Sequence, residues 1–232
     1  VGTRPEIIRL SSIIKKLDQC FEHHIVHTNQ NYDYHLKDIF LKDFNIKPKY
    51  IFEIKSKSVI ENVSKILIKV DQLIKKIKPD AFLILGDTNS SLSAISAKKN
   101  KIPIFHIEAG NRCFNDIVPE EVNRRIVDHI SDINLTYSDF ARNNLLNEGL
   151  RPDRIFKIGS PLYEVINYNK DKIKVNYFLK KNKLKKDQFF LISFHREENV
   201  ENKKNLSNFF EILKYLEKKY KFPILVSTHP RL

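Results

Sequence analysis

The sequence predicts an α/β fold made of doubly wound parallel sheets. Short, continuous apolar runs alternate along its 232 residues with stretches in which apolar residues recur at helical spacing. Runs of the first kind are typical of strands buried on both faces, and stretches of the second kind are typical of helices that cover those faces. Hydrophobic residues make up 41% of the chain and aromatic residues 11%, which is ample for a packed core.

Strands and helices are expected to alternate along the whole chain. Proline favours the first helical position, where its missing N–H leaves nothing unpaired, and this supports helix starts at Pro5, Pro119 and Pro161. The helices are expected at residues 5–18, 34–44, 59–77, 89–99, 119–131, 139–148, 161–168 and 203–219. The strands are expected at residues 24–27, 81–85, 104–107, 133–136, 154–158, 189–194 and 224–227.

The elements are expected to form two doubly wound domains. An N-terminal domain at residues 1–168 would lack only its first strand, because the chain opens on the turn that should follow one. A linker rich in Asn and Lys is expected at residues 169–187, and an incomplete second domain at residues 188–232. The abrupt ends, and the absence of methionine, indicate that the sequence is a fragment.

The composition argues against several classes of function. The net charge of +13 comes largely from lysine pairs that are typical of solvated helix faces, so no nucleic-acid partner is expected. A positive field of this kind would still attract an anionic small substrate. No apolar run approaches the roughly 18–20 residues that cross a membrane, and no signal peptide is visible, so the cytoplasm is the expected location. Cys20 and Cys113 are far apart and predict neither a disulfide nor a metal site.

Acidic residues lie where two predicted strands end. Asp87 follows residues 81–85, Glu108 follows residues 104–107, and Glu120 begins the next helix. Because ligands of open α/β sheets bind at the carboxyl ends of the strands, this cluster suggests proton chemistry. Simpler explanations exist, since Asp87 is a good helix cap and acids in a first turn complement the helix dipole. Glutamate is a poor cap, so Glu108 is harder to explain in this way.

Two further segments favour an anion. Gly2-Thr3-Arg4 forms a turn at a helix N-terminus, where free N–H groups would suit a phosphate, although an ordinary cap with Arg4 on the surface explains it equally well. His195 and Arg196 follow the first strand of the second domain, where histidine can exchange protons and arginine can hold a phosphate.

These segments together resemble the motif series of the non-hydrolysing UDP-N-acetylglucosamine 2-epimerases. The motifs are Gly2-Thr3-Arg4-Pro5-Glu6, Gly86-Asp87-Thr88, His106-Ile107-Glu108-Ala109-Gly110, Pro119-Glu120-Glu121-Val122-Asn123-Arg124 and His195-Arg196-Glu197-Glu198-Asn199. The resemblance implies a glycosyltransferase-B-like pair of Rossmann-like domains. It also implies an isomerase that inverts carbon 2 of a UDP-N-acetylhexosamine without a cofactor, and that is commonly a homodimer.

The resemblance also implies roles for particular residues. UDP would be eliminated from carbon 1 as carbon 2 loses its proton, and would then be added back. The carboxylates that move or position protons would be Asp87, Glu108 and Glu120, with His195 near the diphosphate. The residues expected to bind the substrate or to neutralise UDP are Arg4, Arg112, Arg196 and Glu121.

The sequence departs from this family pattern in ways that leave the sugar open. Asn29-Gln30 stands where the family usually has a glycine before Gln. Asn111-Arg112 and Ser160-Pro161, with a short stretch between Asn111 and Glu121, look closer to sibling epimerases of deoxy- or acetamido-sugars, including the fucosamine pathway. The serine- and glycine-rich loop that holds uridine in the family has no counterpart here. An inactive truncated remnant and a nucleotide-sugar glycosyltransferase are the alternative interpretations.

Overall fold

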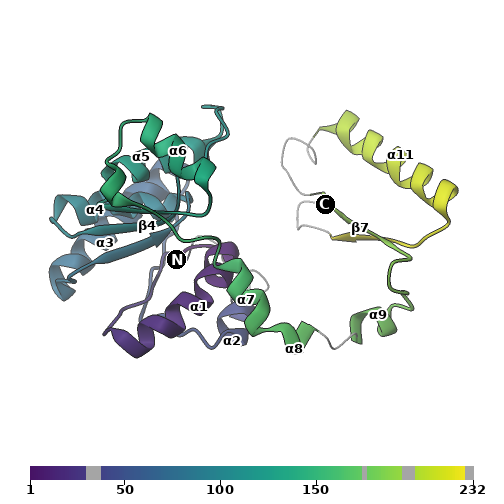
Figure 1. The fold of residues 1–232 in the computed structure, drawn as a ribbon, viewed down its shortest axis with the longest axis horizontal. Coiled ribbons are helices and arrows are strands. Elements are labelled where there is room, and N and C mark those ends of the chain that lie inside the picture. The colour runs from purple at the N-terminus through teal and green to yellow at the C-terminus, as the bar shows by residue number, and fades with distance from the viewer. Residues whose placement is uncertain (30–37, 174–176, 195–201, 228–232) are drawn as a thin grey trace. The chain divides into compact units, whose positions relative to one another are not determined.

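The computed structural model describes residues 1–29, 38–173, 177–194 and 202–227, and it confirms the predicted α/β class (Figure 1). The chain divides into a first unit, Val1–Tyr168, and a second unit, Asn169–Leu232. Within the described ranges, no helix has both the length and the apolar character that a membrane span requires.

The first unit contains a small and a larger parallel sheet. In the small sheet, β1 (Val26–His27) pairs with β2 (Tyr50–Ile51). The larger sheet has the order β3-β4-β5-β6, so its neighbours in space are neighbours in the chain. These strands are β3 (Phe82–Leu85), β4 (Ile104–Ala109), β5 (Ile133–Thr136) and β6 (Ile155–Lys157). All four therefore present their carboxyl ends at one edge.

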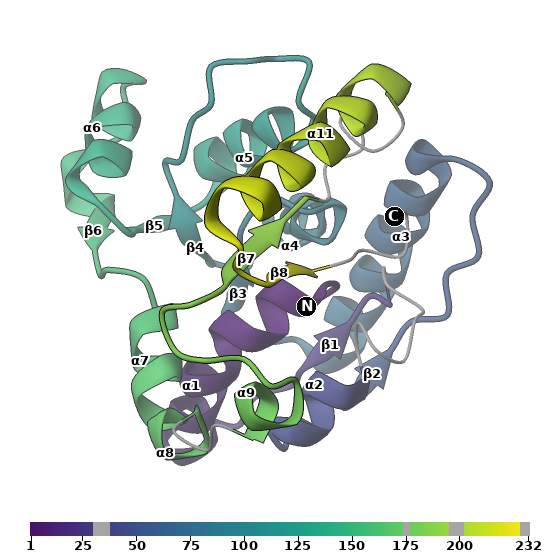
Figure 2. The same cartoon turned by 90° about the vertical axis from the view of Figure 1, so that its right-hand side faces the viewer.

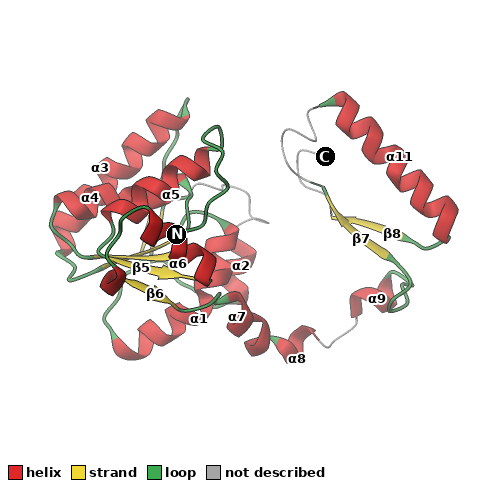
Figure 3. Cartoon of the chain, turned by 45° about the horizontal axis from the view of Figure 1, so that its top comes forward, coloured by secondary structure: helices red, strands yellow, loops and turns green. Residues whose placement is uncertain are grey.

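Helices cover both faces of the larger sheet (Figure 3). Leu85 packs with Ile107 against α1 (Arg4–Cys20) and α2 (Asp38–Asp43). Ile84 and Ile104 pack in a second cluster with α3 (Val59–Ile77), α4 (Ala94–Lys99) and α5 (Pro119–Ile130). Because adjacent strand residues point to opposite faces, Ile84 and Leu85 enter different clusters, as a doubly wound sheet requires.

The remaining elements of the first unit are α6 (Asp139–Asn147), the 3₁₀ turn η3 (Pro152–Arg154) and α7 (Leu162–Tyr168). Helix α7 lies beside α1 (Figure 2), and the Nζ atom of Lys15 is 3.6 Å from the centroid of the Tyr168 ring. This contact brings the end of the first unit back to its first helix.

Local sequence signals explain where the long helices begin and end. In α3 the Ser58 hydroxyl accepts a hydrogen bond from the Glu61 N–H at 3.1 Å, and Lys78 ends the helix in a left-handed conformation. Its buried residues Ile66, Val70 and Ile74 recur every fourth position and form one face. In α1, Thr3 and Glu6 form a capping box.

The sequence predictions miss some elements of the structure. The single helix expected at residues 89–99 begins as a 3₁₀ turn, η2 (Asn89–Ser93), because the hydroxyls of Ser91 and Ser93 donate to nearby backbone carbonyls. The two-residue strand β2 was not predicted. The expected linker holds two short helices, α8 (Lys170–Ile173) and α9 (Tyr177–Lys181). The helix expected at residues 34–44 lies partly outside the described residues.

The second unit has its own parallel strand pair. Strand β7 (Phe190–Ser193) pairs with β8 (Ile224–Ser227), and α11 (Lys203–Tyr220) connects them in the chain. The rings of Phe194 and Phe209 stack with their centroids 4.0 Å apart, which packs α11 onto the end of β7.

We expect the Gly110→Ala variant to lose roughly 2–4 kcal/mol of stability. Gly110 has a φ of +78°, and a Cβ there would lie 2.2 Å from the backbone oxygen of Ala141. The control is Gly149→Ala, since Gly149 has a φ of +85° but no atom within 4 Å of its would-be Cβ. Urea unfolding should show the larger loss for Gly110→Ala, and equal losses would mean that backbone strain alone sets the effect.

Candidate active site

Glu108 interrupts the regular pairing of β4. Ile107 pairs with Leu135 and Ala109 with Thr136, so two steps along β4 match one step along β5. The extra residue, Glu108, has a left-handed φ of +71°. A bulge re-aims a side chain, and strain of this kind concentrates at functional sites. The bulge thus marks Glu108 as a functional candidate.

The Glu108 carboxylate lies in a partly buried position between a cation and a second acid. The Arg9 guanidinium forms an ion pair with it, and the Asn111 amide approaches at 3.5 Å. Burial raises the pKa of Glu108 above its ordinary value, the charge and hydrogen bond of Arg9 oppose that rise, and the charge of Asp87 adds to it. A carboxyl group of this kind is suited to exchange a proton closer to neutrality.

Asp87 follows β3 at the same edge and has a similar environment. The Nε and Nη2 atoms of Arg124 lie 2.9 and 2.6 Å from its Oδ2. Burial nevertheless raises the pKa of Asp87; Arg124 opposes this rise, and the negative charge of Glu120 adds to it. Gly86, just before Asp87, has a φ of +75°, a left-handed conformation that glycine adopts without strain.

The two acids that begin α5 are used differently. Glu120 is exposed, and its charge reaches Asp87. Glu121 is fully buried and accepts hydrogen bonds from the N–H groups of Cys113 at 3.0 Å and Phe114 at 3.3 Å. Burial acts against its ionisation, but these bonds and the charge of Arg124 outweigh burial and lower the pKa of Glu121. Glu121 thus ties the loop after β4 to the start of α5.

Arg112 lies in a buried charge network beneath this edge. Its guanidinium is fully buried, and pairs with Asp128 at 2.7 Å and with Glu148 at 2.6 Å. These acids raise the pKa of Arg112 above its ordinary value although burial opposes the charge. Asp128 also accepts from the Gly110 N–H at 3.1 Å and lies 2.8 Å from Nδ1 of His106.

His106 extends this network to the loop of Asp87. Its ring is fully buried, and Nε2 donates to the Gly86 carbonyl at 2.9 Å. One chain of contacts therefore runs from the residue before Asp87, through His106 and Asp128, to Gly110. It fixes the spacing of the two acidic strand ends.

The N-terminal turn carries its own anion. The Glu6 carboxylate accepts from the N–H groups of Gly2 and Thr3, the latter at 2.7 Å, and from the Thr88 hydroxyl at 2.9 Å. These two N–H groups are thus already used, and Glu6 joins the turn to the Asp87 loop. Arg4 is exposed, with its guanidinium carbon 5.9 Å from the centroid of the Phe40 ring.

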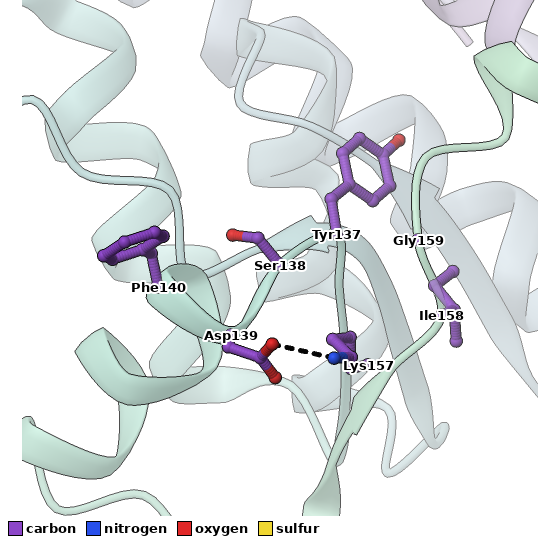
Figure 4. A pocket seen from close by; sticks show the side chains of 7 residues that line it. All are labelled: Tyr137, Ser138, Asp139, Phe140, Lys157, Ile158 and Gly159. Atoms are coloured by element: carbon purple, nitrogen blue, oxygen red, sulfur yellow. Dashed lines mark hydrogen bonds and ion pairs between the residues drawn. The ribbon is translucent and has the colours of Figure 1, made fainter.

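A groove of about 470 Å³ lies at the carboxyl ends of β5 and β6 (Figure 4). Two of its lining residues, Lys157 and Asp139, form an ion pair in which the Nζ and Oδ2 atoms are 2.8 Å apart. Its lining residues are Tyr137, Ser138, Asp139, Phe140, Lys157, Ile158 and Gly159.

Of the predicted proton-transfer residues, the structure brings Asp87 near enough to Glu108 for its charge to act on that acid, and Glu120 near enough to act on Asp87. The predicted residues His195 and Arg196 lie outside the described residues. The predictions of ligand contacts for Arg4, Arg112 and Glu121 stay predictions, although the charged groups of the last two are engaged within the protein. In the portion of the chain that is described, no three His, Cys, Asp or Glu residues are grouped as a metal site would require.

Sequence reasoning missed the partners that set the properties of the acids. Arg9 lies in the middle of α1, Asp128 in the last turns of α5, and Tyr137 just after β5. A basic, an acidic and an aromatic residue in such positions have ordinary surface or core explanations. Only the folded arrangement connects them with Glu108 and Gly110.

Comparison with known proteins gives consistent matches along the chain. A family model described as UDP-N-acetylglucosamine 2-epimerase matches residues 15–232. The structure of UDP-N-acetylglucosamine 2-epimerase from Rickettsia bellii is 46% identical with a TM-score of 0.89, over 99% of this chain and 61% of that one. The enzyme from Methanocaldococcus jannaschii, in complex with UDP-GlcNAc and UDP, is 39% identical with a TM-score of 0.89, over 99% and 65% of the two chains.

A third relative has a different sugar in its name. UDP-2,3-diacetamido-2,3-dideoxy-D-glucuronate 2-epimerase from Pseudomonas aeruginosa is 32% identical, over 100% of this chain and 66% of its own length. The chain thus spans just under two thirds of the length of these relatives. The structural likeness extends over nearly the whole chain, and it bears out the predicted glycosyltransferase-B-like fold class.

Proposed function

The chain belongs to the UDP-N-acetylglucosamine 2-epimerase family, and from this membership we propose that the protein inverts carbon 2 of a UDP-N-acetylhexosamine. The relative from Methanocaldococcus jannaschii was solved with UDP-GlcNAc and UDP, which supports a UDP-sugar as the substrate. The reaction would proceed by elimination of UDP and its re-addition.

The chemistry of the sugar explains why elimination is needed. No carbonyl lies next to carbon 2 to stabilise a carbanion, so simple removal and return of its proton would be very slow. When a base takes this proton, the electron pair forms a double bond to carbon 1 and the bond from carbon 1 to the UDP oxygen breaks. The products are UDP and a 2-acetamidoglucal. Addition of UDP to carbon 1, with a proton delivered to the other face of carbon 2, gives the epimer.

The pairing of Asp87 with Glu108 carries this proposal. Two carboxyl groups from neighbouring strand ends lie in electrostatic contact, and burial raises the pKa of each. Inversion requires removal of a proton on one face and delivery on the other, so two acids on separate elements suit the reaction. Glu120, whose charge acts on Asp87, would be the third carboxyl group of the site.

The leaving diphosphate would need positive charge to stabilise it. We assign this role to Arg4 and Arg196, with His195 beside the diphosphate, because arginine pairs well with phosphate and neutralising a leaving group lowers the barrier. Arg112 and Glu121 would support binding by holding the loop that follows Glu108, since they bond to Asp128 and to the Cys113 N–H.

The sugar is proposed only as a class, a UDP-linked N-acetylhexosamine or an acetamido relative of it. The Pseudomonas aeruginosa relative favours keeping a diacetamido-uronate among the substrates to be tested. The two exposed free cysteines agree with a reducing cytoplasm, and a homodimer is the assembly we expect. We expect neither nucleic acid nor membrane as a partner.

The test is solvent exchange at carbon 2. The protein, incubated in heavy water with UDP-GlcNAc, should give UDP-ManNAc that carries deuterium at carbon 2, seen by proton NMR. Free UDP and a trace of the glucal should accompany it, because UDP leaves during each turnover. The diacetamido-glucuronate nucleotide should be tested in parallel, and deuterium in only one substrate would identify the sugar.

The controls separate this reaction from its alternatives. An Asp153→Asn variant should behave as the parent, since Asp153 is exposed and pairs only with Arg151 among the described residues. Transfer of the sugar to an added acceptor, without deuterium at carbon 2, would indicate a glycosyltransferase. A protein that neither exchanges deuterium nor is stabilised by UDP would contradict the proposal and favour an inactive remnant.

A further inference from the structure

Tyr137 lies beside the bulged acid of the site. It directly follows Thr136, the last residue of β5, which pairs with Ala109, the neighbour of Glu108. The residue packs against the apolar cluster that α1 forms on the sheet, and it is one of the residues that line the groove in Figure 4. The charges of both Glu108 and Arg9 act on its phenol, so the side chain lies near these two groups.

The hydroxyl of Tyr137 is buried and has no hydrogen-bond partner within the described residues. Buried polar groups in native proteins nearly always have a hydrogen-bond partner. We therefore expect the Tyr137 hydroxyl to find one when substrate is bound. Burial, with the charge of Glu108, raises the pKa of the phenol, while Arg9 opposes the rise. The phenol thus keeps its proton at neutral pH and can donate a hydrogen bond.

Arg9 now pairs with the Glu108 carboxylate. If the Arg9 guanidinium moved away, this carboxylate would need another hydrogen-bond donor. The side chain of Arg9 is 32% exposed and that of Glu108 is 15% exposed, so Arg9 can turn to an anion in solvent more readily than Glu108 can reach water. The other charged or titratable groups that act on Glu108 are Asp87 after β3 and His106 of β4. Asp87 is also an acid, and His106 already bonds to Asp128 and Gly86.

We propose that Tyr137 is a positioning residue, whose hydroxyl holds the Glu108 carboxylate when the Arg9 guanidinium turns to the diphosphate of the substrate. The inference rests on the proposed function for the identity of that anion. A phenol donates one hydrogen bond and carries no charge, so it offsets less of the negative charge than the guanidinium does. Substrate binding would therefore keep Glu108 in place and make it a stronger base for the proton on carbon 2.

The hydrogen bond can be tested without substrate by a double-mutant cycle at pH 8. Tyr137→Phe alone should leave the melting temperature unchanged or raise it, because it removes an unpartnered hydroxyl. In the Arg9→Met background the same change should lower the melting temperature by about 2–4 °C, because the hydroxyl is then the donor to Glu108. Additive effects of the two substitutions would overturn the proposal.

The pH profile of turnover provides the second measurement. Tyr137→Phe should lower kcat by about tenfold and move the acidic limb of its pH profile, while the exposed-residue control Tyr163→Phe should change neither. An unmoved profile in Tyr137→Phe would argue against the role. If the parent itself shows no turnover, the proposed function fails, and the melting cycle still decides whether Tyr137 serves Glu108.

Discussion

Replacing Asp128 with alanine should remove about 3–5 kcal/mol from the free energy of unfolding, a large part of the stability of an ordinary domain. The Asp128 carboxylate is fully buried and pairs with Arg112 at 2.7 Å and His106 at 2.8 Å. Without it, the buried Arg112 guanidinium keeps its ion pair with Glu148 but loses the one with Asp128. Urea unfolding followed by circular dichroism measures the loss.

Two variants make this prediction specific. Asp153→Ala removes an exposed acid that is paired with Arg151, and it should cause no measurable change. Asp128→Asn keeps an oxygen acceptor without the charge, so its loss should lie between those of the other two variants. A loss below about 1 kcal/mol for Asp128→Ala would mean that water replaces the carboxylate and that the network is not a source of stability.

The network also connects stability to the candidate site. Asp128 bonds to the Gly110 N–H, and through His106 it reaches the Gly86 carbonyl, so it holds the residues that flank Glu108 and Asp87. Loss of Asp128 should therefore disorder the spacing of the two acids even in molecules that remain folded. Catalysis is sensitive to a misplacement of about 1 Å in the reacting groups. The Asp128→Ala variant should therefore lose activity even under conditions in which it remains folded.

The sequence predicted the elements that depend on local patterns. Buried strands such as residues 81–85 and 104–107 are short apolar runs, and α3 has a regular apolar face between a serine cap and a lysine in left-handed conformation. Strand β2 has only two residues, which is too short for a periodic signal. The 3₁₀ start of the helix expected at 89–99 depends on serine hydroxyls, whose competing bonds a propensity argument does not capture.

The candidate site was predictable in its acids but not in their partners. Asp87 and Glu108 stand out in the sequence because they end apolar runs, whereas Arg9 is one of several basic residues of α1. The bulge at Glu108 arises from the register between β4 and β5, which lie apart in the sequence. Likewise, the sequence does not show that Arg112 is buried and paired. Its acidic partners come from α5 and from the end of α6, which only the fold brings next to it.

Glu108→Gln should lower the rate of deuterium exchange at carbon 2 by about 10²–10⁴-fold, because glutamine can keep the hydrogen bonds but cannot carry the proton. The same change should raise the melting temperature at pH 8. Burial raises the pKa of Glu108, so the native state binds this proton more tightly than the unfolded chain does. The stability that protonation provides is present below the unfolded pKa and is lost as the pH rises through the native one.

Glutamine does not titrate, so the advantage of the variant should disappear as the pH falls below the native pKa of Glu108, where the parent is protonated as well. The matched control is Glu61→Gln on α3, because Lys65 and the Lys57 N–H lower the pKa of the partly exposed Glu61. Its ionised form is the favoured one, so that variant should gain no stability at pH 8 and should keep full exchange.

Full exchange in Glu108→Gln would remove Glu108 from the mechanism. A lower melting temperature at pH 8 would show that the ion pair with Arg9 outweighs the burial of the charge.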